Sequence, residues 1–142
     1  MTFDRKRNQL LIACKGDAGL DKKQKKNVRA IYAFDLDHFE LLEKPLIVLK
    51  EKDLKMLNGG QDFPFEPSAI AIDEESDKIF LLSSVGKSIV SINFSGKPDE
   101  IIFLDERIFQ QPEGLIIRNS NFLIVSEGKG DVAKLILYEK QN

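Results

Sequence analysis

The chain has 142 residues, of which 42% are hydrophobic and 31% are charged, and its formal net charge is −2. This length suits one domain with its own core. The slight negative charge argues against a general nucleic-acid binder, because such proteins need a positive field to neutralise phosphates. The longest apolar runs, at 10–14 and 79–82, are far shorter than the roughly 20 residues that span a bilayer, so no membrane span is expected.

Three segments share one pattern, in which a hydrophobic residue and a polar turn are followed by a mostly apolar run, a small or polar residue and a glycine. They are residues 3–16 (FDRKRNQLLIACKG), 72–86 (IDEESDKIFLLSSVG) and 117–128 (IRNSNFLIVSEG). An alternating run follows each glycine after a short polar loop. Gly86 and Gly128 are about 42 residues apart, which is the spacing of a four-stranded propeller blade.

In chain order, residues 1–50 are predicted to form an incomplete blade, because only residues 1–4 precede its first turn. Its other strands are expected at 9–15, 28–35 and 46–49. The polar segment 17–27 (DAGLDKKQKKN) is interpreted as an insertion. Residues 51–66 are a second insertion, with a short helix over 51–57 that ends at Asn58-Gly59-Gly60.

Residues 67–105 are predicted to form a complete blade, with strands at 68–73, 78–84, 88–93 and 100–104. Residues 106–142 are expected to form another incomplete blade, with strands at 114–118, 121–126 and 133–138. The predicted fold class is therefore all-β: a β-propeller fragment of about two and a half four-stranded antiparallel blades.

Such a fragment would leave two apolar sheet faces open, whereas a propeller closes into a ring of typically at least four blades. Three explanations are open. The chain is a piece of a longer protein and needs the missing half of the propeller, it pairs with a second copy, or its open faces are covered in a way that the sequence hides. The abrupt start at MTFDR, compared with the lead-ins PSAIAID and PEGLIIR of the other repeats, favours the first explanation.

Four segments together resemble the SdiA-regulated family of bacterial β-propellers, distant relatives of NHL-repeat proteins. They are NQLLIACKG, RAIYAFDL, FEPSAIAIDEESDKIFLLSSVGKSIVSIN and FQQPEGLIIRNSNFLIVSEG. The resemblance runs from about Phe3 to Tyr138 and corresponds to roughly the C-terminal half of the family's domain. It implies a ring usually described as five-bladed, a periplasmic or cell-envelope location, a calcium site and no established catalytic activity. This sequence shows neither the family's N-terminal half nor its export or anchoring segment, since residues 1–5 lead into charge.

Glu113 and Glu127 are the candidate ligands of such a calcium ion. The inner strand of a propeller blade starts at a mouth of the central channel, so Glu113 and its repeat equivalent Ser68 should approach the axis. Calcium takes about six to eight oxygen ligands from carboxylates, carbonyls and water. Glu113 is the preferred ligand, and Glu127 would join it directly or through water. In the alternative interpretation, both glutamates are solvated and Gly114 and Gly128 are simply turn glycines.

Other catalytic patterns are weak in this sequence. The single histidine, His38, has no second His or Cys near it, Cys14 ends an apolar strand, and no G-x-S-x-G motif is present. The predicted function is therefore non-catalytic binding of an unknown ligand or protein. The alternative is a metal-dependent hydrolase resembling the propeller lactonases and esterases, in which a strand-start glutamate holds the ion that polarises a carbonyl or activates water.

Overall fold

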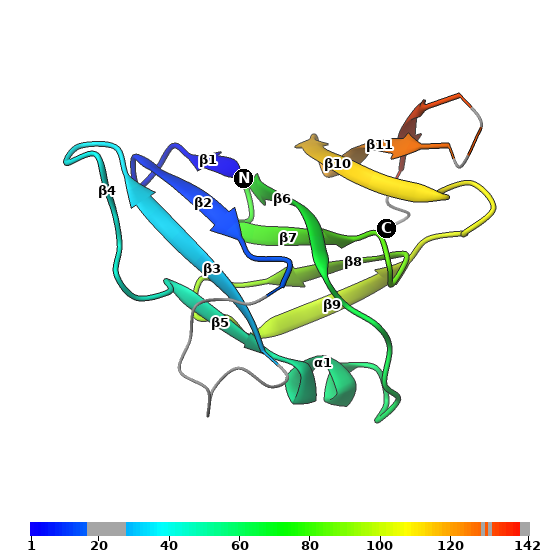
Figure 1. Ribbon diagram of the computed structural model, residues 1–142, viewed down its shortest axis with the longest axis horizontal. Coiled ribbons are helices and arrows are strands. Elements are labelled where there is room, and N and C mark those ends of the chain that lie inside the picture. The colour runs from blue at the N-terminus through cyan, green and yellow to red at the C-terminus, as the bar shows by residue number, and fades with distance from the viewer. Residues whose placement is uncertain (17–27, 129, 131, 140–142) are drawn as a thin grey trace.

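The computed structural model describes residues 1–16, 28–128, 130 and 132–139. These residues form three antiparallel sheets of five, four and three strands, together with one short helix (Figure 1). The all-β prediction is confirmed at this level, and the described part of the chain forms no closed propeller. The insertion predicted at 17–27 lies outside the described residues.

The first sheet begins with β1 (Thr2–Asp4), β2 (Gln9–Ala13) and β3 (Val28–Asp35), which pair in that order. Two further short strands, β4 (Glu40–Leu41) and β5 (Ile47–Lys50), both pair with β3. The predicted helix is confirmed as α1 (Glu51–Leu57). Acidic residues in its first turn and Lys55 in its last turn suit the helix dipole.

The middle sheet is a four-stranded meander, and the third sheet has three strands in sequence order. Their bounds are β6 (Pro67–Asp73), β7 (Lys78–Ser83), β8 (Ser88–Ile92), β9 (Pro98–Phe103), β10 (Gln111–Arg118), β11 (Asn121–Glu127) and β12 (Lys134–Tyr138). Each predicted strand is present. The largest difference in bounds is at β10, which starts at Gln111 because the PEG lead-in already pairs with β11.

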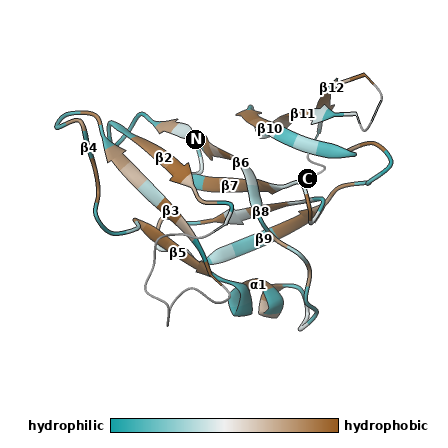
Figure 2. Cartoon of the chain, viewed as in Figure 1, coloured by the Kyte–Doolittle hydropathy of each residue, from teal (hydrophilic) through white to brown (hydrophobic). Residues whose placement is uncertain are grey.

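The middle sheet packs on both of its neighbours. Along β7, Ile79 and Leu81 belong to the core shared with the first sheet and α1, whereas Phe80 and Leu82 belong to the core shared with the third sheet. All four are buried, and each such side chain contributes about 1.5–3 kcal/mol when it leaves water. Figure 2 shows hydrophobic residues on much of β2, β3, β5 and β7 and hydrophilic ones in many of the turns. Two sheet-to-sheet cores therefore hold the molecule together.

The first strands of the three sheets lie side by side, since β6 contacts β1 on one side and β10 on the other. At the end of the sheets where these strands finish, the β1–β2 turn is joined to the β6–β7 turn. Arg7 lies 2.9 Å from Asp77 and 3.2 Å from the buried Asp4, and its guanidinium lies over the Phe94 ring at 3.6 Å from the centroid. These contacts fix the first sheet against the middle one.

The two end sheets each keep an apolar face uncovered. On the third sheet, Ile116, Val125, Leu135 and Leu137 are between 42% and 66% exposed. On the first sheet, Phe3, Leu41 and Val48 are exposed on the side that faces away from the middle sheet. No helix in the described ranges is long and apolar enough to cross a membrane.

Candidate functional site

The sheet end at which β6 and β10 begin is the candidate site. Ser68 and Glu113 occupy equivalent positions there, because each is the extra residue where the register of its strand pair shifts. Such bulges bend a strand and redirect a side chain, and they are common beside active sites. We call Pro67, Ser68, Pro112 and Glu113 the strand-start rim.

A hydrogen bond joins the two halves of the strand-start rim. The Ser68 hydroxyl oxygen lies 2.9 Å from the carbonyl oxygen of Pro112 and 3.2 Å from that of Leu82, so its proton can be donated to either. Pro112 directly precedes Glu113. The start of β6 is thereby fixed to the start of β10 beside the glutamate, as the predicted equivalence of Ser68 and Glu113 requires.

Buried serines support the same end of both sheets. The backbone N–H of Glu66 donates to Ser83 Oγ, and that of Gln111 donates to Ser126 Oγ, each at 3.1 Å. Both serines are at most 2% exposed. Their hydroxyls fix the segment that leads into each first strand. The register of the first sheet places Cys14 at the equivalent position.

Cys14 is partly buried, and burial raises the pKa of its thiol. A raised pKa leaves less thiolate at a given pH, and the thiolate is the nucleophile. We therefore expect Cys14 to react with iodoacetamide more slowly in the folded chain than in the urea-unfolded chain at pH 8, with the midpoint of its rate–pH profile shifted upward. Faster alkylation in the folded chain would show an activated thiol instead.

The two predicted metal ligands lie at the same end of the third sheet but differ in setting. Glu113 is half-buried on the bulge, whereas Glu127 is the exposed last residue of β11, opposite Gln111. The described residues contain no group of three or more His, Cys, Asp or Glu side chains that could hold a metal ion. They therefore supply only part of the six to eight or so oxygens that calcium takes, and the two ligands stay predictions.

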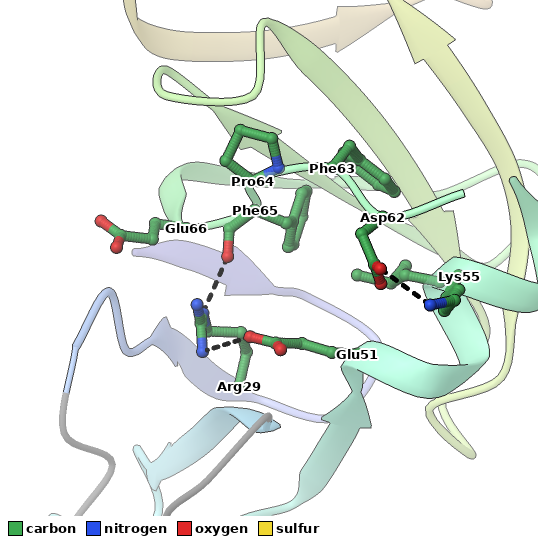
Figure 3. A pocket seen from close by; sticks show the side chains of 9 residues that line it. Arg29, Glu51, Lys55, Asp62, Phe63, Pro64, Phe65 and Glu66 are labelled. Carbon is green, nitrogen blue, oxygen red and sulfur yellow. Dashed lines mark hydrogen bonds and ion pairs between the residues drawn. The ribbon is translucent and has the colours of Figure 1, made fainter. Parts of the chain in front are cut away.

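A hollow apart from the strand-start rim lies between β3, α1 and residues 62–66, with a volume of about 340 Å³ (Figure 3). Arg29 is fixed at its edge, because its Nε donates to the Phe65 carbonyl at 2.8 Å and its Nη1 lies 3.1 Å from Glu51. Lys55 pairs with Asp62 at 2.7 Å. An anionic ligand would have to displace Glu51 from Arg29. Apart from the phenylalanines on either side of Pro64, little in the sequence predicts this pocket.

His38 lies in the turn between β3 and β4. Its Nδ1 lies 2.8 Å from Asp35 Oδ2, which raises the pKa of His38 and lowers that of Asp35. The imidazole side chain is 74% exposed, so water screens the pair and its effect on stability is small.

Comparison with protein-family models, with curated proteins and with solved structures finds no match. The resemblance to SdiA-regulated propellers therefore depends on the quoted sequence segments alone.

Proposed function

We propose that the chain is an open segment of a β-propeller and serves as a non-catalytic binding module. Three successive antiparallel sheets, with their first strands side by side and their faces packed on one another, support this proposal, because blades of a propeller are arranged in this way. The observation that carries it is the bond from Ser68 to Pro112. This bond holds Ser68 of the middle sheet beside the equivalent residue of the third sheet, Glu113, at the strand-start rim.

The proposal includes membership of the SdiA-regulated family and, with it, a cell-envelope location. Its support is the likeness of the quoted sequence segments, and the strands from β2 to β11 follow the repeat in those segments. The partner would be either the missing part of the propeller or a second copy, and the exposed apolar faces of the two end sheets support the need for one.

We assign recognition to the strand-start rim, with Glu113 as a calcium ligand and Glu127 as a second, weaker contributor. Water and residues outside the described set would complete the coordination. Glu113 suits this role because its bulge position separates its side chain from the regular alternation of β10. The ion would then fix the rim for an incoming ligand, and it would have no part in bond breaking.

Isothermal titration of CaCl₂ into the chain tests the calcium site. We expect binding, and we expect Glu113→Gln to weaken it on the order of tenfold or more, because calcium affinity follows the charge of the ligand set. Glu75→Gln is the matched control, since Glu75 is an exposed glutamate in the turn at the opposite end of the middle sheet. Equal calcium binding by the unmodified chain, Glu113→Gln and Glu75→Gln would contradict the assignment of Glu113.

Hydrolysis assays with lactones and aryl esters, run with and without calcium, test the absence of catalysis. We expect no turnover above the buffer rate. Metal-dependent turnover that Glu113→Gln abolishes would overturn the binding-module proposal and favour the metal-dependent hydrolase.

A further inference from the structure

The uncovered face of the third sheet is a continuous apolar surface. The register places Ile116 opposite Leu123, Leu123 opposite Leu137 and Val125 opposite Leu135. Directly paired residues point to the same side of a sheet, and this side is opposite to the one on which Phe122 and Ile124 are buried. We call these five residues, Ile116, Leu123, Val125, Leu135 and Leu137, the outer face. Contiguous exposed apolar surfaces of this kind mark interaction sites.

Arg118 and Glu127 stand at opposite ends of the outer face. Arg118 follows Ile116 by two residues on β10, and Glu127 follows Val125 by two residues on β11, so both side chains project on this side of the sheet. Because β10 and β11 are antiparallel, Arg118 is at one end of the strands and Glu127 at the other. Both are exposed, and neither forms an ion pair with another described residue.

We infer that the outer face binds a second copy of this chain, face to face, with the strands of the two copies running in opposite directions. A twofold axis that lies between the sheets, perpendicular to the strands, generates this arrangement. Each subunit then presents the same patch to the other. The apolar side chains cover one another at the centre, and Arg118 of each copy approaches Glu127 of its partner. Glu127 is also the weaker of the two proposed calcium contributors, so the dimer is tested in the absence of calcium.

The charges disfavour the other arrangement of two copies, in which the first sheet of one packs head to tail on the outer face of the other. At the interface between the first and middle sheets, equivalent turns lie next to each other, as the 2.9 Å pair between Arg7 and Asp77 shows. The same alignment across copies would bring Arg118 towards the β1–β2 turn, where Arg5, Lys6 and Arg7 already pair with Glu74, Asp77 and Asp4. That turn therefore offers Arg118 no unpaired carboxylate. Reversed strands instead bring Arg118 to Glu127 of the partner and so gain two attractive pairs.

Light scattering and sedimentation velocity over a wide range of protein concentration, in chelator-containing buffer, test the inference. We expect a reversible dimer. Leu135→Glu places a charge at the centre of the outer face and should give a monomer, and a thermal melt of this variant checks that it folds. Phe3→Glu is the matched control, because Phe3 is an exposed apolar residue on the uncovered face of the first sheet. It should leave the dimer intact.

Exchange of the charges at Arg118 and Glu127 tests the relative orientation of the two copies. Arg118→Glu alone and Glu127→Arg alone should each raise the dissociation constant on the order of tenfold, and the double variant should restore it to within about threefold. A monomer at every concentration, or a dimer that Phe3→Glu dissociates and Leu135→Glu does not, would overturn the inference. Failure of the double variant to recover would overturn the reversed orientation. Calcium binding is tested separately with Glu113→Gln, which leaves both charges of the outer face in place, so the two proposals can fail independently.

Discussion

Replacement of Phe122 by alanine is expected to lower the free energy of unfolding by about 3–5 kcal/mol. Phe122 is 1% exposed, between the middle and third sheets. Its ring centroid lies 5.3 Å from that of Phe80 and 6.1 Å from that of Tyr138. Truncation would remove these ring contacts and leave a cavity between two sheets whose backbones are held by hydrogen bonds, so the cavity could close only in part.

Urea denaturation followed by far-UV circular dichroism measures this effect. The reference protein, the Phe122→Ala variant and the control should all carry Leu135→Glu as well, so that self-association adds nothing to their apparent stability. Phe39→Ala is the matched control, because the Phe39 side chain is 76% exposed in a turn, and it should change stability by less than about 0.5 kcal/mol. A loss below about 1 kcal/mol for Phe122→Ala would show that the third sheet does not pack on the middle sheet as described.

The strands could be predicted because their turns are built from local chemistry. Asp73 accepts a hydrogen bond from the N–H of Glu75, and Asn93 accepts from the N–H groups of Ser95 and Lys97. Asp and Asn stabilise turns in this way from within the turn itself. Together with period-two alternation, such turns indicate where β6, β7, β8 and β9 begin and end. The two-residue strand β4 is too short to show any period, and it was missed.

The features that give the site its shape depend on residues far apart in the chain. Arg29 contacts the carbonyl group of Phe65, and Ser68 contacts that of Pro112. In each case a side chain donates to a backbone oxygen. Every residue has such an oxygen, so the sequence does not indicate which one is the acceptor. The same applies to the ion pair between Arg7 and Asp77. Local patterns indicated which segments were strands, but they held no information on these long-range contacts.

The two candidate ligands show both what the sequence predicts about the site and what it does not. The repeat placed Glu113 beside Ser68 and placed Glu127 at the same end of the sheet, and the register agrees with both placements. A metal site also needs the positions of ligands on other strands. Those depend on how the sheets are stacked, which the spacing of glutamates in one repeat does not determine.

The β7–β8 turn and the segment before β6 approach each other closely at Gly86. A Cβ atom added at Gly86 would lie 2.1 Å from the carbonyl oxygen of Pro64 and 3.1 Å from Ser88 Oγ. The Pro64 oxygen has little freedom to retreat. The next residue, Phe65, is 3% exposed in the core, and its carbonyl group accepts the hydrogen bond from Arg29. Any larger residue at position 86 must therefore displace backbone.

Gly86→Ala is expected to destabilise the fold by at least about 2 kcal/mol, because overpacking against fixed backbone forces a shift in the surrounding structure. Urea denaturation measures the loss. Gly16→Ala is the matched control, since Gly16 ends the corresponding repeat and an added Cβ meets nothing within 4 Å. It should be neutral or stabilise by up to about 1 kcal/mol through the unfolded state. Equal stabilities for the two variants would show that residues 62–66 do not pack on the β7–β8 turn, and the pocket around Arg29 would then lose one of its walls.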